Sequence, residues 1–323
     1  MNSWQEFPWQ DEEPDPTRDR LCTESRDPTH FDCRIEGASF IRQPTAPKDE
    51  IVLCAYNVER GLRLDDQLQT FTGDAGMPSP DVLLLSEADR GCTRSGDRNV
   101  AREYARALGM CYVYGVEFVE LPRFWGPGGA SPVRERCEHG NAIISRYPLG
   151  NVRAIRHRLA RNWNSAWQRI LRIGEPRLGG RVALAADVRI GEQTLRVYSV
   201  HFESGHRGRK PDAYREAQAR ELIEDASELR QGVVIGGDMN VSRYLGLRYD
   251  DGSREPATTA FLESGYEDAH AALQRDERIT SDSGVAIDLI FGRGVRFTGA
   301  GVGPRDIWSG LSNHLPVWAS VSL

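Results

Sequence analysis

Acids, amides and histidines stand at the ends of several short apolar runs in this sequence. In chain order they are Asn57, Glu59, Glu87, His201, Asp238 and Asn240. A single acid at such a place is usually a cap or a turn former, but the repeated placement is harder to explain in that way. Because open α/β folds gather ligands where strands end, these residues are expected to meet at one site.

Residues of these types meet the requirements for hydrolysis of a phosphate ester. Carboxylates such as those of Glu59 and Glu87 are suited to hold Mg²⁺ or Mn²⁺, which neutralises charge on the phosphoryl oxygens. Asp238 is suited to act as the base that activates water. Histidines and asparagines can donate to the charge of the transition state, where one well-placed donor is worth about 3 kcal/mol. The set therefore predicts a metal-dependent phosphoesterase.

The elements expected to position these residues are many short strands and few helices. Short runs rich in Val, Ile, Leu and Tyr predict strands. They lie at 51–57, 81–87, 141–146, 181–190, 194–202, 232–238, 286–291 and 316–321. Helices are expected at 97–108 and at 211–230, the second opening on Pro211. Its expected apolar face comprises Tyr214, Ala217, Leu222, Ala226 and Leu229. This texture predicts an α/β protein with sheets packed together.

Seven segments, in order along the chain, resemble the endonuclease/exonuclease/phosphatase family, whose fold is called DNase I-like. They are YNVERG (56–61), LLSEADRG (84–91), GNAIISRYPL (140–149), SVHFES (199–204), GGDMN (236–240), AIDLIF (286–291) and SNHLPV (312–317). The resemblance implies a four-layer α/β sandwich, in which two mixed β-sheets pack face to face with flanking helices. It also implies a phosphodiester hydrolase that uses in-line attack of water, with Mg²⁺ or Mn²⁺ as cofactor.

The resemblance assigns metal and water chemistry to five residues of this chain. Glu87 is implied to be the principal metal ligand, assisted by Asn57 and Glu59. Asn57 also falls among the residues expected to bind the substrate. Asp238 is implied to orient or deprotonate the attacking water. Asn240, two residues after Asp238, would point the same way as Asp238 along an extended chain and would hold the phosphate or a metal-bound water.

The resemblance assigns phosphate contacts to a second group of residues. His201 and His314 are implied to donate hydrogen bonds to phosphoryl oxygens, and Asp288 is expected to hold the imidazole of His314. Tyr214 and Arg215, at the start of the expected second helix, resemble a position that contacts the phosphate in nucleases of the family. Either histidine taken alone would be explained as well by an ordinary buried position.

One departure from the family pattern concerns the metal site. This chain has Asn313 between Ser312 and His314, where the family usually has aspartate. An asparagine keeps an acceptor oxygen but loses the charge, so a metal ion is expected to bind more weakly there. Glu59 would compensate. A binding module that lost its chemistry is the alternative, but the Asp238 and Asn240 pair argues against it.

Several other polar residues have two interpretations each. His139 precedes the strand at 141–146 and either faces the site or is an ordinary structural histidine. His206 lies in a charged loop and is expected to be exposed to solvent. Arg146 and Arg181 are expected to form structural or surface ion pairs.

The substrate is indicated by two segments and by the overall charge. Residues 150–181 hold eight arginines and one acid, together with Trp163 and Trp167, and a Gly/Pro loop spans 121–136. Arginine beside aromatic residues suits phosphates and bases, although a solvated basic loop explains the stretch equally well. The net charge of −6 gives no general attraction to a polyanion. We expect a nucleic acid or nucleotide, with a small-molecule or lipid phosphoester as the alternative.

The remaining composition suggests an ordinary globular enzyme. Residues 1–48 are expected to be a polar, partly ordered arm, and residues 49–323 the catalytic domain. The start of the chain lacks the pattern of a secretory signal, and an apolar run long enough to span a bilayer is not expected. The six cysteines lack CxxC spacing and are expected to be reduced thiols, which favours a cytoplasmic location. The sequence carries no signal for an oligomeric state.

Overall fold

A computed structural model describes most of the chain. The described residues are 4–9, 22–23, 32–120, 137–161, 163, 177–205, 209–241, 244–245, 248–249 and 255–323. The predicted specificity loop at 121–136, together with Trp167 and His206, lies outside these residues.

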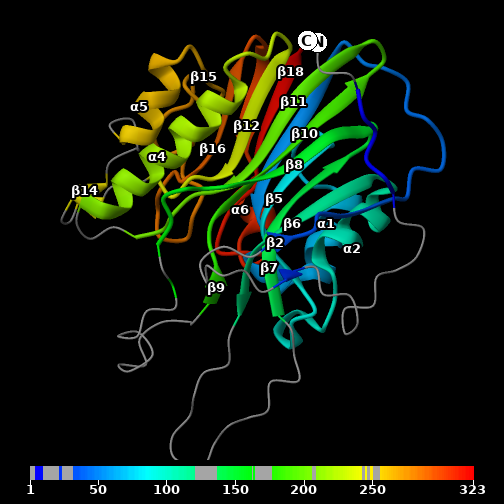
Figure 1. Cartoon of the computed structure of the whole chain (residues 1–323), viewed down its shortest axis with the longest axis horizontal. Coiled ribbons are helices and arrows are strands. Elements are labelled where there is room, and N and C mark those ends of the chain that lie inside the picture. Colours follow the sequence, from blue (N-terminus) through cyan, green and yellow to red (C-terminus); the bar gives the residue numbers. More distant parts are fainter. Residues whose placement is uncertain are drawn as a thin grey trace, which may run out of the picture.

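Two mixed β-sheets form the centre of the molecule (Figure 1). The six-stranded sheet has the order β15 (Glu267–Asp268), β16 (Asp288–Arg293), β12 (Gly232–Asp238), β11 (Gln193–His201), β10 (Val182–Ile190) and β8 (Leu149–Arg156). The eight-stranded sheet has the order β17 (Arg296–Val302), β18 (Val317–Ser322), β4 (Glu50–Asn57), β5 (Val82–Arg90), β7 (Cys137–Ser145), β6 (Cys111–Glu120) and β3 (Glu36–Ser39), with β9 (Arg177–Gly179) paired to β6. Only the β4–β5 and β11–β12 pairs are parallel among the named pairs of these two sheets.

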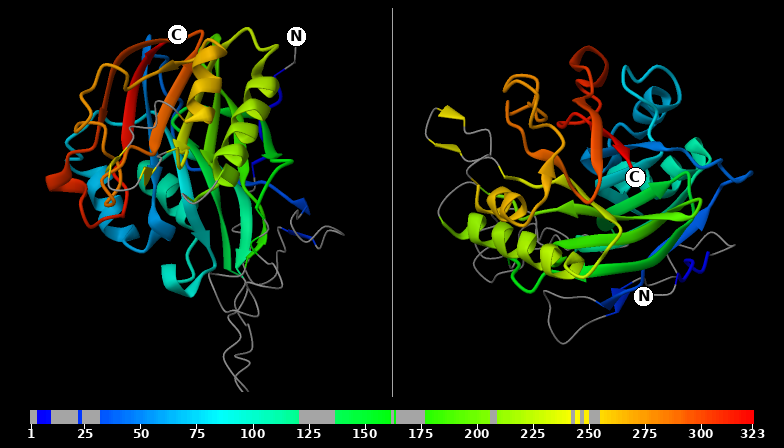
Figure 2. Two further views of the ribbon diagram at one scale, coloured as in Figure 1. Left: turned by 90° about the vertical axis from the view of Figure 1, so that its left-hand side faces the viewer. Right: turned by 90° about the horizontal axis from the view of Figure 1, so that it is seen from above.

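Helices cover the outer face of each sheet (Figure 2). Helices α1 (Leu64–Thr72) and α2 (Val100–Leu108) pack on the eight-stranded sheet, and α4 (Arg209–Ala226) and α5 (Pro256–Glu263) pack on the six-stranded sheet. The shorter elements are β1 (Cys22–Thr23), β2 (Asp32–Cys33), η1 (Glu59–Gly61), η2 (Thr93–Ser95), β13 (Tyr244–Leu245), β14 (Arg248–Tyr249) and α6 (Arg305–Trp308).

Alternation along the strands divides the apolar residues between the layers. In β4, Leu53 and Ala55 face the other sheet, whereas Cys54 and Tyr56 face the layer of α1 and α2. Successive side chains of a strand point to opposite faces, so a strand buried on both sides reads as a continuous apolar run. The predicted four-layer sandwich of two face-to-face sheets with flanking helices is confirmed.

The predicted elements all appear, and the structure adds others. Each of the eight predicted strands and both predicted helices has a counterpart within a few residues. Strands β6, β8 and β17 and helices α1 and α5 were not predicted. Strand β3 lies inside the segment expected to be an arm and pairs with β6 at the edge of the eight-stranded sheet.

The buried face of α4 differs from the predicted one. Tyr214 and Ala217 are only half-buried, whereas Arg215 and Gln218 are buried together with Leu222. Two polar side chains therefore belong to the face that packs on the sheet. Apolar periodicity could not identify this face, because the buried residue in the first turns of α4 is an arginine, Arg215, which is held by hydrogen bonds.

The cysteine prediction was wrong at two positions. Cys92 and Cys137 form a disulfide between the segments that follow β5 and begin β7. Cys54 and Cys111 are free and buried, as expected. Disulfides are typical of oxidising compartments, so the cysteines no longer support a cytoplasmic location. Among the described residues, no helix is both long and apolar enough to cross a membrane.

Replacing Cys92 and Cys137 together with serine should lower the free energy of unfolding by about 2–4 kcal/mol, because the bond restricts the unfolded chain across 45 residues. Urea unfolding followed by circular dichroism measures the change. Two results together would show that the bond does not form: the variant is as stable as the wild type, and Cys92 and Cys137 of the unfolded wild type are alkylated under non-reducing conditions.

Candidate functional site

Three polar residues form a row across the six-stranded sheet. His201 at the end of β11 is paired in register with Asp238 at the end of β12. Asp238 is in turn paired with Asp288 at the start of β16. Strand register therefore places three of the predicted residues side by side at one edge of the sheet.

Two β-bulges in the eight-stranded sheet lie opposite this row. The pairing of β5 with β7 shifts between Leu85 and Ala88, and Glu87 lies inside the shift with a φ of 56°. The pairing of β6 with β7 shifts between Val116 and Phe118, and Glu117 lies inside it. A bulge redirects the side chain of its extra residue, and positive φ in a non-glycine residue is a strain found at functional sites.

Asp238 is fixed by contacts from both sheets. Its Oδ2 accepts a hydrogen bond from Nδ2 of Asn57, which ends β4 in the other sheet, at 3.0 Å. Its Oδ1 accepts the backbone N–H of Asn240 at 3.0 Å. The Nε2 atoms of His201 and His314 lie 3.5 and 3.8 Å from Oδ2. The carboxylate is thus held with one edge turned toward two imidazoles.

His314 and Asp288 form the predicted acid–histidine pair. Nδ1 of His314 donates to Oδ2 of Asp288 at 2.8 Å. Burial opposes protonation of the ring, but Asp288 and Asp238 outweigh it and raise the pKa of His314 to about 10. His314 is therefore a cation at neutral pH. Ser312 anchors this loop, because its hydroxyl donates to the backbone carbonyl of Asn57 at 2.8 Å.

His201 has a different partner, which sets its tautomer. Nη1 of Arg181 lies 2.6 Å from Nδ1 of His201 and 3.0 Å from Oε2 of Glu117. Oε2 of Glu117 lies farther from Nδ1 of His201, at 3.5 Å. Because a guanidinium only donates, the shorter contact makes Nδ1 the acceptor and places the proton on Nε2, which faces Asp238 and Glu87. Arg181, expected in a structural or surface ion pair, forms a buried ion pair with Glu117 and also orients His201. Burial opposes ionisation of Glu117, but Arg181 outweighs it and lowers the pKa to about 2.

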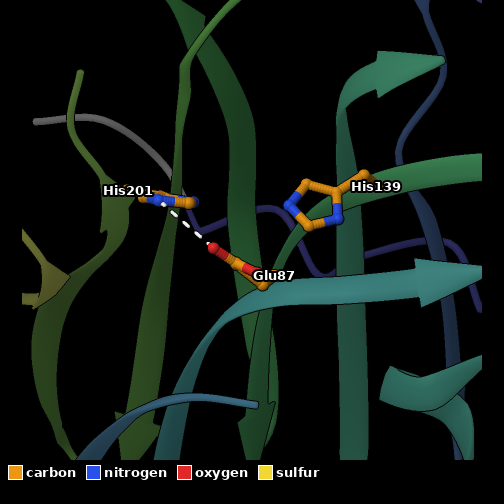
Figure 3. A group of neighbouring side chains, drawn as sticks. All are labelled: Glu87, His139 and His201. Carbon is orange, nitrogen blue, oxygen red and sulfur yellow. Dashed lines mark ion pairs between the residues drawn. The ribbon is translucent and has the colours of Figure 1, made fainter. Parts of the chain in front are cut away.

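Glu87 lies between two imidazoles (Figure 3). Its Oε1 is 3.8 Å from Nε2 of His201, and one ligand atom from each of Glu87, His139 and His201 lies within 4.8 Å of the others. Burial opposes the charged carboxylate, yet His139, His201 and His314 outweigh it and hold the pKa of Glu87 well below its usual range. The side chain stays 24% exposed. An ionised, accessible carboxylate in this position is suited to bind a metal ion.

The other predicted metal ligands lie nearby but are tied to one another. Oε2 of Glu59 accepts the backbone N–H of Asn313 at 2.9 Å, and Oδ1 of Asn57 accepts the backbone N–H of Glu59 at 3.0 Å. Asn313 is exposed. A carboxylate and an amide oxygen can each accept more than one bond, so these contacts leave coordinating capacity. Oxygen donors from Glu87, Glu59 and Asn57 fit a hard divalent cation.

Arg215 and Asn240, both expected to contact the phosphate, have other partners here. The guanidinium of Arg215 is 1% exposed and donates to Glu255 and Asp212 at 2.7 Å each. It also donates to the carbonyls of Glu203 and Gly205, just after His201, so it holds that loop and does not face a phosphate. Tyr214 is half-buried on the same helix. Nδ2 of Asn240 donates to the carbonyl of Phe202.

Sequence reasoning missed Arg60, Asp89 and Glu117, which contribute charge in and around this site. It expected an ion pair for Arg181 but not its contact with His201, and it left His139 open. Asp89 lies inside the segment LLSEADRG, and alternation from Glu87 would have placed both on one face. Glu117 carried no usable signal, because its direction depends on a bulge in β6.

The family model described as the endonuclease/exonuclease/phosphatase family matches residues 54–319. None of the curated proteins is significantly similar to the chain in sequence.

Solved structures with the same fold include three at low sequence identity. An endonuclease/exonuclease/phosphatase from Beutenbergia cavernae is 17% identical, with a TM-score of 0.61, covering 85% of this chain and 72% of that one. TDP2 from D. rerio, complexed with a single-strand DNA product, is 18% identical, with a TM-score of 0.57 and coverages of 85% and 100%. The human Nocturnin catalytic domain with a bound sulfate is 17% identical, with a TM-score of 0.55 and coverages of 86% and 96%.

Replacing Glu117 with glutamine should destabilise the protein in a pH-dependent way. The folded pKa of about 2 lies below the ordinary value of 4.5, so the carboxylate stabilises the fold above pH 4.5 and stops doing so as pH falls toward 2. Loss of the charge leaves Arg181 buried without its counter-ion, at a cost of about 3–5 kcal/mol near pH 7.

Urea unfolding at pH 7 and across the range between these two pKa values measures the difference from wild type, which should shrink as the pH falls. The exposed Glu267 offers the matched control, because its replacement by glutamine removes a charge outside the site. A stability difference that does not change with pH would contradict the assigned ion pair.

Proposed function

Because the chain belongs to the endonuclease/exonuclease/phosphatase family, we propose that it is a metal-dependent phosphodiester hydrolase. The observation that carries the proposal is the placement of Asp238. Its carboxylate is held by Asn57 from the opposite sheet and lies within 4 Å of the imidazoles of His201 and His314. A fixed base beside two donors is what in-line attack of water on a phosphate requires.

Asp238 is proposed to orient the attacking water and to accept its proton. Both carboxylate oxygens already accept one bond from the protein, which fixes the plane of the group. Water attacks phosphorus from the side of Asp238, the ester bond opposite breaks, and the leaving oxygen departs away from the base. Fixing the base in advance removes the cost of reorganising it during the reaction.

The two histidines are proposed to donate to phosphoryl oxygens. His201 carries its proton on Nε2, because Arg181 occupies Nδ1. His314 donates Nδ1–H to Asp288 and, as a cation, also has a proton on Nε2. Two donors on one side of the phosphate stabilise the charge of the transition state more than that of the substrate. Asn240 supports this arrangement by holding Phe202, the residue after His201.

A divalent cation is proposed to bind at Glu87, with Asn57, Glu59 and the adjoining Asn313 near it. When bound, Mg²⁺ or Mn²⁺ would neutralise phosphoryl charge and stabilise the leaving oxygen. The low pKa of Glu87, which keeps its carboxylate ionised, supports this assignment. Arg60 also contributes positive charge near this carboxylate.

A nucleic acid or nucleotide is the proposed substrate class. The described part of the arginine–tryptophan stretch supports it: Arg161 lies over the ring of Trp163 at 4.3 Å, and Trp163 packs edge-on against Phe118. Phe118 in turn contacts His139 beside Glu87. Trp163 is partly exposed, and an aromatic ring beside arginine near a phosphate site suits stacking of a base. The TDP2 neighbour that contains a single-strand DNA product agrees with this class.

Replacing Asp238 with asparagine should lower kcat for diester hydrolysis by roughly 100- to 10,000-fold, because the variant cannot accept the proton of water. The measurement compares bis(p-nitrophenyl) phosphate with p-nitrophenyl phosphate, each with Mg²⁺ or Mn²⁺ and after addition of EDTA. Diester cleavage that needs the metal ion and is lost in the variant is the expected result.

Asp225 on α4 provides the control for this variant, because its carboxylate pairs with Arg153 on the outer face. Its replacement by asparagine should keep the wild-type kcat. Preference for the monoester would instead indicate a phosphatase of a small molecule or lipid. Unchanged activity after replacement of both Asp238 and His314 would contradict the proposed roles.

Replacing Trp163 with alanine should selectively weaken hydrolysis of a single-stranded oligonucleotide. Stacking of one base is worth about 1–3 kcal/mol, so kcat/KM for the oligonucleotide relative to the chromogenic diester should fall by roughly 5- to 150-fold. An unchanged ratio would remove the argument for base stacking and favour a substrate without bases.

A further inference from the structure

His139 on β7 is a buried histidine whose outer nitrogen has no protein partner. The side chain is 1% exposed, and Nδ1 lies 2.9 Å from Oδ1 of Asp89. Within the described part of the chain, no hydrogen-bond partner reaches Nε2. A buried imidazole nitrogen without a partner costs free energy, so its retention calls for a ligand.

The orientation of this ring is fixed from behind. Asp89 lies directly opposite His139 in the β5–β7 pairing. Nε and Nη2 of Arg94 donate hydrogen bonds to the two carboxylate oxygens of Asp89 at 2.6 and 3.0 Å. Carboxylates that hold the far nitrogen of a histidine are a recurring feature of metal ligands, because they set the tautomer and increase basicity. Figure 3 shows the ring of His139 turned toward Glu87 and His201.

His139 and His201 have partners of opposite kind. A carboxylate only accepts, so Asp89 places a proton on Nδ1 of His139, and the neutral ring then has its lone pair on Nε2. Arg181 does the reverse at His201, where Nε2 carries the proton. Of the two imidazoles that flank Glu87, only that of His139 can therefore offer a lone pair to a cation.

We propose that Nε2 of His139 is a nitrogen ligand of the metal ion bound by Glu87, so that the site selects a first-row transition ion over Mg²⁺. This rests on the proposed function, which places a cation at Glu87. Two ligand atoms about 2.1 Å from one ion lie at most about 4.2 Å apart. The ligand atoms of this group lie within 4.8 Å of one another, so small side-chain movements suffice.

The chemical reason for the selectivity is the donor set. Mg²⁺ strongly prefers oxygen ligands and retains much of its water, whereas first-row transition ions accept imidazole nitrogen readily. Adding one nitrogen to a carboxylate site strengthens the binding of Mn²⁺, Co²⁺ or Zn²⁺ much more than that of Mg²⁺. His139 would thus determine which cation the hydrolase uses.

The test is pulsed electron paramagnetic resonance of the full-length protein loaded with Mn²⁺. The wild type should show a coupling between the electron spin and ¹⁴N, which changes to that of ¹⁵N after labelling of histidine. The His139→Gln variant should lose the coupling, and its Mn²⁺ affinity should fall by roughly 10- to 100-fold. Its Mg²⁺ affinity, measured by competition, should change far less.

His157 provides a matched control. It is also 1% exposed and pairs with a carboxylate, that of Glu221 at 2.8 Å, but it does not belong to the group around Glu87. His157→Gln should retain the nitrogen coupling, and so should His201→Gln. Loss of the coupling in His201→Gln with retention in His139→Gln would overturn the assignment.

The outcomes separate this inference from the proposed function. Tight binding of Mn²⁺ without nitrogen coupling in the wild type would overturn the role of His139 and leave a cation at Glu87. If Mn²⁺ binds no more tightly to the wild type than to Glu87→Gln, the metal-dependent function fails as well. If His139→Gln does not fold, His201→Gln decides the question: coupling retained in that variant leaves the assignment to His139 standing, and coupling lost overturns it.

Discussion

The negative charge of carboxylates buried between two sheets must be balanced by positive groups or hydrogen-bond donors, because removing such a charge from water costs several kcal/mol. Glu87 and Asp238 approach this region from opposite sheets, and basic groups of the site lie around them. His314, as a cation, and Arg181 supply positive charge, and Asn57 joins the sheets through a hydrogen bond to Asp238. His314 is also one of the proposed phosphate donors, so the charge that the fold requires there is the charge that the proposed catalysis would use.

The backbone brings the site residues of the two sheets together in two different ways. In the six-stranded sheet, regular register is sufficient, since it aligns His201 and Asp288 on either side of Asp238. In the eight-stranded sheet, bulges interrupt the ladder and redirect Glu87 and Glu117. Bulges and positive φ angles cost free energy locally, and the packed strands around them supply the stability that holds them. Regular pairing thus positions Asp238, the proposed base, and irregular pairing positions Glu87, the proposed ligand of the cation.

The sequence predicted what depends on short-range pattern and missed what depends on long-range packing. Apolar runs identified the central strands. The motif order selected Glu87, Asp238 and His314, which the structure brings together although only Asp238 ends a strand. Arg215 was misread as a phosphate contact because only the packed structure shows that its helix face is buried. Glu117 and Arg181 could not be paired from the sequence, since they are 64 residues apart and meet through a bulge. The disulfide was missed for the same reason, because cysteine spacing does not report which strands are neighbours.

Asp238 is proposed to direct water to phosphorus in a single in-line displacement. The most direct test of this proposal is the stereochemical course at phosphorus, measured with one diastereomer of a chiral phosphorothioate diester hydrolysed in ¹⁸O-labelled water. One direct attack by water inverts the configuration, and inversion is the result that the geometry predicts. Retention would require two successive displacements through a covalent intermediate on the protein, and it would contradict the role given to Asp238.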